Sequence, residues 1–407
     1  MTDFDLIIIG GGIIGGSTLY HLSQLGYKGR VLVLEREDAL SKGSTALSAG
    51  GFRNIWTTPI NMRLTSYSIR KLAKFREELD WPIGFDQRGY LFCQTEDKFE
   101  NAKTFGAEWE KNGVRIEFLE PREVEKKVPG LKAGIDHIDP EVSELLGMKA
   151  IGGGVFGPDC GAFDPSAAAV GYFERAIEGM SGRAELRLRT EVKRLHIEDG
   201  EYRGIELSDG TMLKSEKVFV AAGAWTNALL EVSGVRGDDL PPVVPLKRML
   251  FITNLPPIEG FDRIPMTIID DGIYFRPEGP NLLIGRADPF TEAGFDLTAD
   301  AQYYEEKINF VMQERVPGME RCRLMSMWAG LYDTNEVDHN AVLGEHPHYK
   351  NLLFATGFSG HGAMEAPAAG LAMAELAMTG AYQTIDCSEL SIRRFWEKRP
   401  IHETIVI

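Results

Sequence analysis

The 407-residue chain lacks several features that would place it in a class at once. No apolar run reaches about 18 residues, so the sequence predicts no membrane-spanning segment. The four cysteines are widely spaced and form no CxxC pair, which excludes a zinc motif and a disulfide framework and favours a reducing, cytoplasmic compartment. Basic residues are not in excess, because the net charge is −16, and we therefore expect no nucleic-acid partner. Asp3 and Asp5 precede the first apolar run, which favours a strand over a signal peptide.

The first 35 residues hold the most informative pattern that is present. Residues 5–9 (DLIII) predict a buried strand, which runs directly into the glycine-rich segment 10–15 (GGGIIG). A helix is expected over 17–25, and a second buried strand over 31–34 ends on Glu35. Strand, glycines, helix, strand and acidic residue together predict a dinucleotide-binding βαβ unit.

Each of these positions has a physical role in binding a dinucleotide. Gly10 allows a tight turn, Gly12 lets the backbone approach a pyrophosphate, and Gly15 lets the helix pack closely on the strand. The N-terminus of the helix presents N–H groups and a positive dipole to the phosphates. Glu35 is placed to accept hydrogen bonds from an adenosine ribose and would repel a ribose phosphate, which disfavours NADP.

The rest of the chain alternates between helical and β-like patterns. Further helices are expected over 62–79, 98–112, 165–179 and 366–378, with Asp164 as the cap of the third. Strands are expected over 90–93, 217–223 and 351–356. A hairpin is expected over 191–208, with its turn at Asp199-Gly200. Between 243 and 284 the runs are short, β-like and punctuated by proline. Nucleotide-binding signatures at the start, middle and end of the chain, with β-rich material between them, indicate one domain interrupted twice by another.

The predicted fold class is therefore α/β, in two domains. A Rossmann-like dinucleotide-binding domain would comprise residues 1–85, 150–235 and 325–385. A β-sheet-rich substrate domain would comprise 86–149 and 236–324, and 386–407 would form a C-terminal tail.

Motifs in several places carry a family resemblance. Besides 7–16, they are Leu34-Glu35-Arg36, Gly43-Ser44-Thr45, Phe163-Asp164-Pro165, Val220-Ala221-Ala222-Gly223-Ala224-Trp225 and Thr356 to Gly362. The chain resembles the flavin-dependent amine and amino-acid oxidoreductases of the D-amino acid oxidase, glycine oxidase and sarcosine oxidase superfamily. Trp328-Ala329-Gly330-Leu331-Tyr332, with Asp338-His339-Asn340 after it, is similar to the FAD-dependent oxidoreductase domain-containing branch. The resemblance implies bound FAD, a substrate held over the flavin beneath a β-sheet lid, and oxidation of a C–N bond to an imine that water hydrolyses.

The resemblance also implies a set of cofactor-binding residues. They are Gly10, Gly12, Ile13, Ile14, Gly15, Glu35, Arg36, Ser44, Thr45, Ser48, Ala49, Gly50, Gly51, Val192, Ala222, Gly223, Trp225, Gly330, Gly357, Phe358, Ser359, Gly360, His361 and Gly362. The helix after Gly362 would direct its N-terminus at the flavin and stabilise the negative charge of the reduced ring. No cysteine lies near Gly330, and Leu47 stands where some relatives have a histidine, so we expect non-covalent FAD.

The substrate site departs from the family pattern at three positions. Tyr332, Met364 and Leu283 stand where relatives have, respectively, a carboxylate-binding arginine, a lysine, and the lysine that promotes reaction with oxygen. The substrate carboxylate must therefore be held elsewhere, and Arg53, Arg286 and Arg276 are candidates because a guanidinium pairs with a carboxylate in two-point fashion.

We therefore expect an FAD-dependent oxidation of the CH–NH bond of a small secondary or N-substituted amino acid. The candidate catalytic residues are Arg53, Arg286, His361 and Tyr332, with Trp56 and Tyr274 as further candidates for the cavity wall, and no metal is expected. Electrons would pass to oxygen or to another acceptor. Three alternatives stay open: a dehydrogenase that reduces a partner protein or quinone, a non-catalytic flavoprotein assembly factor, and an NAD dehydrogenase. The exact substrate is open, and so is the oligomeric state, with a homo-oligomer among the options.

Overall fold

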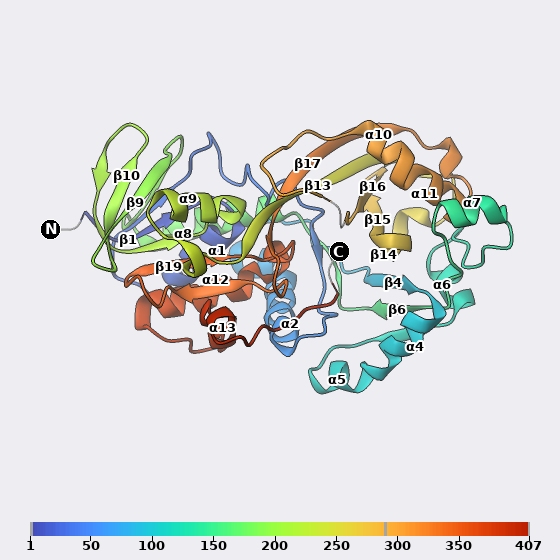
Figure 1. Ribbon diagram of the computed structural model, residues 1–407, viewed down its shortest axis with the longest axis horizontal. Coiled ribbons are helices and arrows are strands. Elements are labelled where there is room, and N and C mark those ends of the chain that lie inside the picture. Colours follow the sequence, from blue (N-terminus) through green and yellow to red (C-terminus); the bar gives the residue numbers. More distant parts are fainter. Residues whose placement is uncertain (1–2, 289–290, 406–407) are drawn as a thin grey trace.

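A parallel sheet lies at the centre of the left-hand lobe in Figure 1, which shows the computed structural model. The structure describes residues 3–288 and 291–405. The sheet has the strand order β18-β19-β12-β1-β2-β8, and only β18 runs antiparallel to its neighbour. Its strands are β1 (Phe4–Ile9), β2 (Val31–Leu34), β8 (Ala184–Arg187), β12 (Ser215–Val220), β18 (Val342–Glu345) and β19 (Leu352–Thr356).

Both faces of this sheet are buried. On one face α1 (Ile13–Gln24) packs between α8 (Pro165–Met180) and α12 (Gly362–Thr379), and α2 (Pro59–Ala73) packs on α12. Ile8 belongs to the core on this face, whereas Ile7 and Ile9 belong to a second core formed with a three-stranded sheet and α9 (Thr226–Val232). The three strands are β9 (Val192–Glu198), β10 (Glu201–Leu207) and β11 (Met212–Leu213). Burial on both faces explains why β1 is a continuous apolar run rather than an alternating one.

An eight-stranded sheet forms the second lobe, at the right of Figure 1. Its order is β17 (Leu324–Asn335), β13 (Val243–Asn254), β16 (Asn281–Arg286), β15 (Ile273–Glu278), β14 (Met266–Ile269), β4 (Tyr90–Gln94), β6 (Gly153–Gly157) and β5 (Glu117–Leu119). Only the β14–β4 pair is parallel. A third apolar core lies between this sheet and helices that include α6 (Pro121–Lys127) and α11 (Phe310–Arg315). A short ribbon of β3 (Gly51–Phe52) and β7 (Gly161–Ala162) joins distant parts of the chain.

The hairpin and the helix over 165–180 confirm their sequence signals. Asp199 and Gly200 both have positive φ (50° and 72°), as the favoured two-residue hairpin turn requires. Asp164 accepts a hydrogen bond from the Ala167 N–H at 3.0 Å and so caps α8.

Other expected boundaries are wrong for identifiable reasons. The helix expected over 62–79 is divided at Lys74 into α2 and α3 (Phe75–Leu79), and that over 98–112 is divided at Phe105 into α4 (Glu96–Thr104) and α5 (Gly106–Lys111). Helix α12 begins at Gly362 rather than Ala366, because Pro367 lies inside the helix and does not mark its first turn.

The region expected to hold only short strands contains the 12-residue strand β13. Pro245 has no backbone N–H, yet the strand tolerates it. At Pro245 the strand β13 pairs with β17 alone, because its pairing with β16 begins only at Leu250, so the edge that faces β16 needs no N–H donor there. The predicted domain boundaries are not followed by the sheets: β6 and β17, both assigned to the dinucleotide-binding domain, pair within the eight-stranded sheet.

Two further observations concern the described residues. No helix among residues 3–288 and 291–405 combines the length and apolar character needed to cross a bilayer. All four cysteines are free thiols.

Candidate active site

A cavity of about 600 Å³ opens at the carboxyl ends of the parallel strands and extends to the eight-stranded sheet. Ile9, Leu34, Ala221 and Ala355 line it, and each lies at or near the end of one of four neighbouring strands. This edge of an open parallel sheet is where nucleotides bind. The volume suits a large cofactor.

Most of the predicted cofactor-binding residues line this cavity. They are Gly10, Gly12, Ile13, Ile14, Glu35, Arg36, Ser44, Thr45, Ser48, Val192, Ala222, Gly223, Trp225, Phe358, Gly360 and Gly362. The others in the set do not line it: Gly15, Ala49, Gly50, Gly51, Gly330, Gly357, Ser359 and His361. Residues from the start, middle and end of the chain therefore meet around one cavity.

The glycine-rich turn is closely packed against its neighbours. Gly10 has φ +119°, and a Cβ there would lie 2.3 Å from the Ala221 carbonyl oxygen. A Cβ on Gly15 would lie 2.3 Å from the Gly10 carbonyl oxygen, so Gly15 shapes the turn without lining the cavity. Both glycines allow a backbone approach that a side chain would prevent.

The carboxylate of Glu35 is fixed at the cavity wall. One oxygen accepts from the Gly11 N–H at 2.7 Å and the other from the Glu37 N–H at 2.9 Å. Its remaining lone pairs can accept from ribose hydroxyls. Arg36, the next residue, has its guanidinium 4.1 Å from the ring centroid of Trp225. Both side chains line the cavity near Glu35.

Two helix N-termini point into the cavity. Helix α1 begins next to Gly12 and α12 begins next to His361, and neither N-cap residue caps its helix with its side chain. Gly12, Ile13, Gly362 and Ala363 line the cavity. The Ile13 N–H of α1 donates to the Thr45 hydroxyl at 3.2 Å. Each helix start brings positive partial charge to the cavity, which suits a pyrophosphate and an anionic ring.

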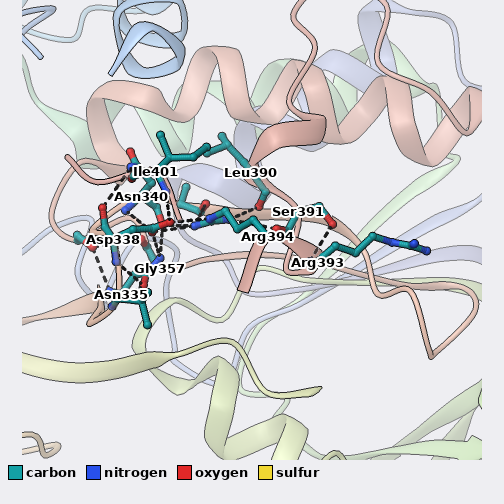
Figure 2. Close-up of polar contacts among 12 residues, drawn as sticks. Asn335, Asp338, Asn340, Gly357, Leu390, Ser391, Arg393, Arg394 and Ile401 are labelled. Carbon is teal, nitrogen blue, oxygen red and sulfur yellow. Dashed lines mark hydrogen bonds and ion pairs between the residues drawn. The ribbon is translucent and has the colours of Figure 1, made fainter. Parts of the chain in front are cut away.

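A buried polar network holds the turn before α12, as Figure 2 shows. Asp338 and Arg394 form a buried ion pair at 2.8 Å. Asn335 donates to Asp338 at 2.7 Å, and its own N–H donates to the Ser359 hydroxyl at 3.0 Å. The Ile401 N–H donates to Asp338 at 3.0 Å, so the C-terminal tail is tied to the same network. Because these groups satisfy one another, the network fixes the turn.

Three tyrosines gather where the cavity meets the eight-stranded sheet, and a glycine makes room for each. A Cβ on Gly360 would lie 2.3 Å from the Tyr332 ring, on Gly285 it would lie 2.3 Å from the Tyr274 ring, and on Gly51 it would overlap the Tyr90 hydroxyl. Of the three, Tyr332 lines the cavity. Burial raises the pKa of both the Tyr274 and the Tyr332 phenol, so both keep their protons at neutral pH.

Arg248, on β13, does not line the cavity itself but lies against Tyr332, which does, and the sequence analysis did not name it. Its guanidinium carbon lies 5.2 Å from the ring centroid of Tyr332. One terminal nitrogen donates to the Lys247 carbonyl at 3.1 Å and to the Thr291 hydroxyl at 3.4 Å, while the buried Nε has no hydrogen-bond partner among the described residues. A buried donor without a partner beside the cavity is a natural anchor for an anion. No motif surrounds Arg248, so only the sheet register could have revealed it.

Arg53 lies elsewhere in the fold. It is buried, donates to the carbonyls of Ile55 at 2.5 Å and Ile405 at 2.6 Å, and lies over the ring of Trp56. Arg276 donates to the Ala49 carbonyl at 2.8 and 3.0 Å. Arg286 lies at the end of β16, with a terminal nitrogen 3.5 Å from the Lys307 carbonyl. Neither these three arginines nor Arg248 line the cofactor cavity. Arg248 differs from them in its position over Tyr332, which does line it. The role of Arg53, Arg276 and Arg286 as carboxylate anchors stays a prediction.

His361 and Trp56 also lie behind the cavity wall rather than in it. The two rings pack edge to face with centroids 4.3 Å apart. Burial lowers the pKa of His361 well below its usual value, so the ring is neutral. Glu365, one helical turn further along α12, has an oxygen with no partner in the described part of the chain, and burial raises its pKa to about 8.

Asp333 is a second residue that the sequence analysis missed. It lines the cavity directly after Tyr332, and burial raises its pKa to about 6 although the backbone N–H groups of Phe358 and Gly357 oppose that shift. Within the described part of the chain, no group of three or more His, Cys, Asp or Glu side chains is arranged to hold a metal ion.

Comparisons with known proteins agree with this geometry. Residues 5–376 match the DAO family, described as FAD dependent oxidoreductase. The chain is 31% identical to the FAD-dependent oxidoreductase domain-containing protein 1 of Xenopus laevis over 99% of this chain and 85% of that protein. It is 26% identical to the mitochondrial sarcosine dehydrogenase of Homo sapiens, covering 96% of this chain and 41% of that protein.

Among solved structures, the L-proline dehydrogenase from P. horikoshii superposes with a TM-score of 0.83. The two chains are 27% identical, and the match covers 98% of this chain and all of the other. The similarity therefore extends over both lobes, including the sheet that carries Arg248 and Tyr332.

Proposed function

Because this chain belongs to the DAO family of FAD-dependent oxidoreductases, we propose that it oxidises the C–N bond of a small secondary or N-substituted amino acid. Sarcosine-, glycine- and iminodiacetate-like molecules are the substrate class. The single observation that carries this proposal is the position of Arg248: an arginine whose buried N–H has no partner among the described residues lies over Tyr332, where the cofactor cavity meets the sheet.

The residues present fit FAD. Gly10 and Gly12 with the start of α1 would hold the pyrophosphate, and Glu35 would hold the ribose. The isoalloxazine ring would then lie toward the far end of the cavity, at Ser48, Tyr332 and the start of α12. When bound, FAD supplies the acceptor for a hydride from the substrate. The α12 N-terminus would stabilise the negative charge of the reduced state.

The remaining chemistry belongs to side chains of the eight-stranded sheet. Arg248 would pair with the substrate carboxylate, and the neutral phenols of Tyr332 and Tyr274 would donate or accept hydrogen bonds beside it. Orientation of the substrate C–H bond, rather than a dedicated base, would contribute most of the rate. The amine would enter in its neutral form.

The manner of cofactor attachment follows from the cysteines. Cys322 is half-buried and precedes β17, and the other three cysteines do not line the cavity either, so we propose non-covalent FAD. Acid precipitation of the yellow protein should leave a colourless pellet, and a pellet that keeps the colour would contradict non-covalent binding. The cytoplasmic location is likewise a prediction from the free thiols, which cell fractionation tests.

The test of the main proposal is an anaerobic screen of amines against the FAD-loaded protein. Sarcosine, N-ethylglycine, iminodiacetate, proline and glycine would each be mixed with the holoprotein while flavin absorbance near 450 nm is followed. We expect at least one N-substituted amino acid to bleach the flavin within seconds to minutes. Its decarboxylated counterpart (for sarcosine, dimethylamine) should not do so, because it gives Arg248 nothing to bind. Failure of every amine would instead favour the non-catalytic alternative.

A further inference from the structure

A second cavity of about 590 Å³ lies on the other side of the segment that closes the flavin end of the first. Leu283 and Trp328 of the eight-stranded sheet line it, together with Met266, Ile83 and Phe163. Of the residues that the sequence analysis or the proposed function assigns to FAD or substrate, only Ser48, Gly50, Arg276 and the strand residue Leu283 line it. Its position relative to the cofactor cavity decides whether a molecule bound in it could exchange electrons with FAD.

The wall between the two cavities is one segment of backbone. Leu47 and Ser48 line the cofactor cavity, while Ala46, Ser48 and Gly50 line the second cavity. Ser48 thus belongs to both. A molecule in the second cavity would be separated from the flavin end of the first by this segment alone.

The second cavity also supplies the side chains that hold the wall in place. Arg276 donates two hydrogen bonds to the Ala49 carbonyl, at 2.8 and 3.0 Å, and Trp328 donates one to the Leu47 carbonyl at 3.1 Å. On the opposite side, a Cβ on Gly330 would lie 2.9 Å from the Leu47 side chain, so β17 packs directly on the segment. These contacts hold the wall between the two cavities in place.

The charged groups of this cavity are already engaged by the protein. Arg88 pairs with Asp86 at 2.8 Å, Arg276 pairs with Glu278, and Asp164 caps α8. Among the described residues, no buried side-chain atom without a hydrogen-bond partner belongs to this cavity. The lining is therefore mixed: these paired polar groups stand beside the apolar side chains of Leu283, Met266 and Phe163, each of which is less than 5% exposed. Such a lining suits a neutral planar ring that carries polar groups at its edge.

We propose that this second cavity receives the electron acceptor of the enzyme, and that the acceptor is a quinone. The proposal rests on FAD occupying the first cavity, as proposed above. Two electrons would leave the reduced cofactor and enter the quinone, which takes up two protons to become a hydroquinone, while FAD returns to its oxidised form. Substrate at Arg248 and acceptor behind Ser48 would then use separate cavities, so both could be bound at once.

The test uses FAD-loaded protein and menadione as the quinone. Ala162 of β7 lines only the second cavity, and Ala162→Trp would fill it; Asp262→Trp at its exposed rim is the second variant, should the first fail to fold. Ala107→Trp, on an exposed face of α5, is the matched control. The first readout is equilibrium binding of menadione to the oxidised holoprotein by calorimetry. The second is the rate at which dithionite-reduced flavin is reoxidised by menadione, which needs no amine substrate.

We expect the plugged variants to bind menadione at least about tenfold more weakly and to reoxidise about tenfold more slowly with menadione, while the control behaves as wild type. Equal binding and equal reoxidation in a folded, plugged variant would overturn the proposal. So would competition between menadione and an amine substrate for one site. If no amine reduces the flavin but the plugged variants still slow the menadione reaction, the proposed substrate fails and the acceptor site stands.

Discussion

The two ends of the cofactor cavity are built in different ways. At the nucleotide end, the binding groups are backbone N–H groups and one carboxylate, nearly all from residues 9–48, and each is fixed by a local hydrogen bond or close contact. At the flavin end, the groups are side chains from three separate strands and the start of α12. Tyr332 on β17, Arg248 on β13 and Tyr274 on β15 meet only because the sheet places them together. Under the proposed function, the first end would hold FAD and the second would select the substrate.

The comparison predicts that backbone changes at the nucleotide end have the largest effect. Gly10→Ala should abolish FAD binding, because the residue has φ +119° and its Cβ would lie 2.3 Å from the Ala221 oxygen. The strain alone costs ~1–3 kcal/mol, and the clash moves the phosphate-binding turn. Flavin content of the purified protein and the melting temperature are the measurements.

Gly234→Ala is the control for Gly10→Ala. Gly234 also has a positive φ (+97°), but among the described residues no atom lies within 4 Å of the position that its Cβ would take. We expect this variant to lose about 1 kcal/mol of stability and to keep full flavin content. Similar flavin loss in both variants would show that φ alone, and not the close approach, matters at Gly10.

At the flavin end, a side-chain change should separate substrate binding from cofactor binding. Arg248→Ala should keep normal flavin content and raise the apparent dissociation constant for the substrate about 10- to 100-fold, as expected for a lost charged hydrogen bond of about 1.5–3 kcal/mol. Anaerobic titration of flavin absorbance measures it. Arg286→Ala is the paired variant, and a larger loss there than at Arg248 would return the anchor to the position predicted from sequence.

The flavin end should also respond to pH through Glu365. Burial raises the pKa of this carboxyl to about 8, so the native state holds a proton that the unfolded chain releases above its ordinary pKa near 4.5. Stability should therefore fall as pH rises from about 4.5 to 8, by at most about 1.4 kcal/mol per pH unit. Glu403, Asp333 and Arg53 are the charged groups that act on it.

Glu365→Gln should remove this pH dependence and stabilise the protein most at pH 8.5, as followed by melting temperatures at pH 6 and 8.5. Glu110→Gln, an exposed change on α5, should leave the dependence intact. An unchanged slope in Glu365→Gln would mean that the carboxyl is ionised in the native state.

The smallest effect is expected from the rim of the nucleotide end. Arg36 lies 4.1 Å from the Trp225 ring, is partly exposed, and contributes a cation–π contact of about 0.5–1 kcal/mol. Arg36→Ala should weaken FAD binding less than about fivefold, measured by fluorescence titration of the apoprotein. A loss as large as that of Gly10→Ala would mean that the side chain binds the cofactor directly.

The sequence predicts the nucleotide end of the cavity better than the flavin end. The glycine turn, Glu35 and the hairpin over 192–207 are local patterns: the hairpin forms, and Gly10, Gly12 and Glu35 line the cavity. Of the segment before α12, only Phe358, Gly360 and Gly362 of the predicted residues line it. The role of Arg53 stays a prediction, because its place in the sequence says nothing about the direction of its side chain, which donates to the Ile405 carbonyl. Arg248 and Asp333 carry no local motif, since their importance depends on the register between β13 and β17.

The distance in sequence between the two helix N-termini has a consequence for biosynthesis. Roughly 350 residues separate the start of α1 from the start of α12. At ~5–20 residues per second, the ribosome needs about 20–70 s to pass from one to the other. Throughout that interval the emerging glycine turn lacks its counterpart, so cofactor capture must await nearly the entire polypeptide.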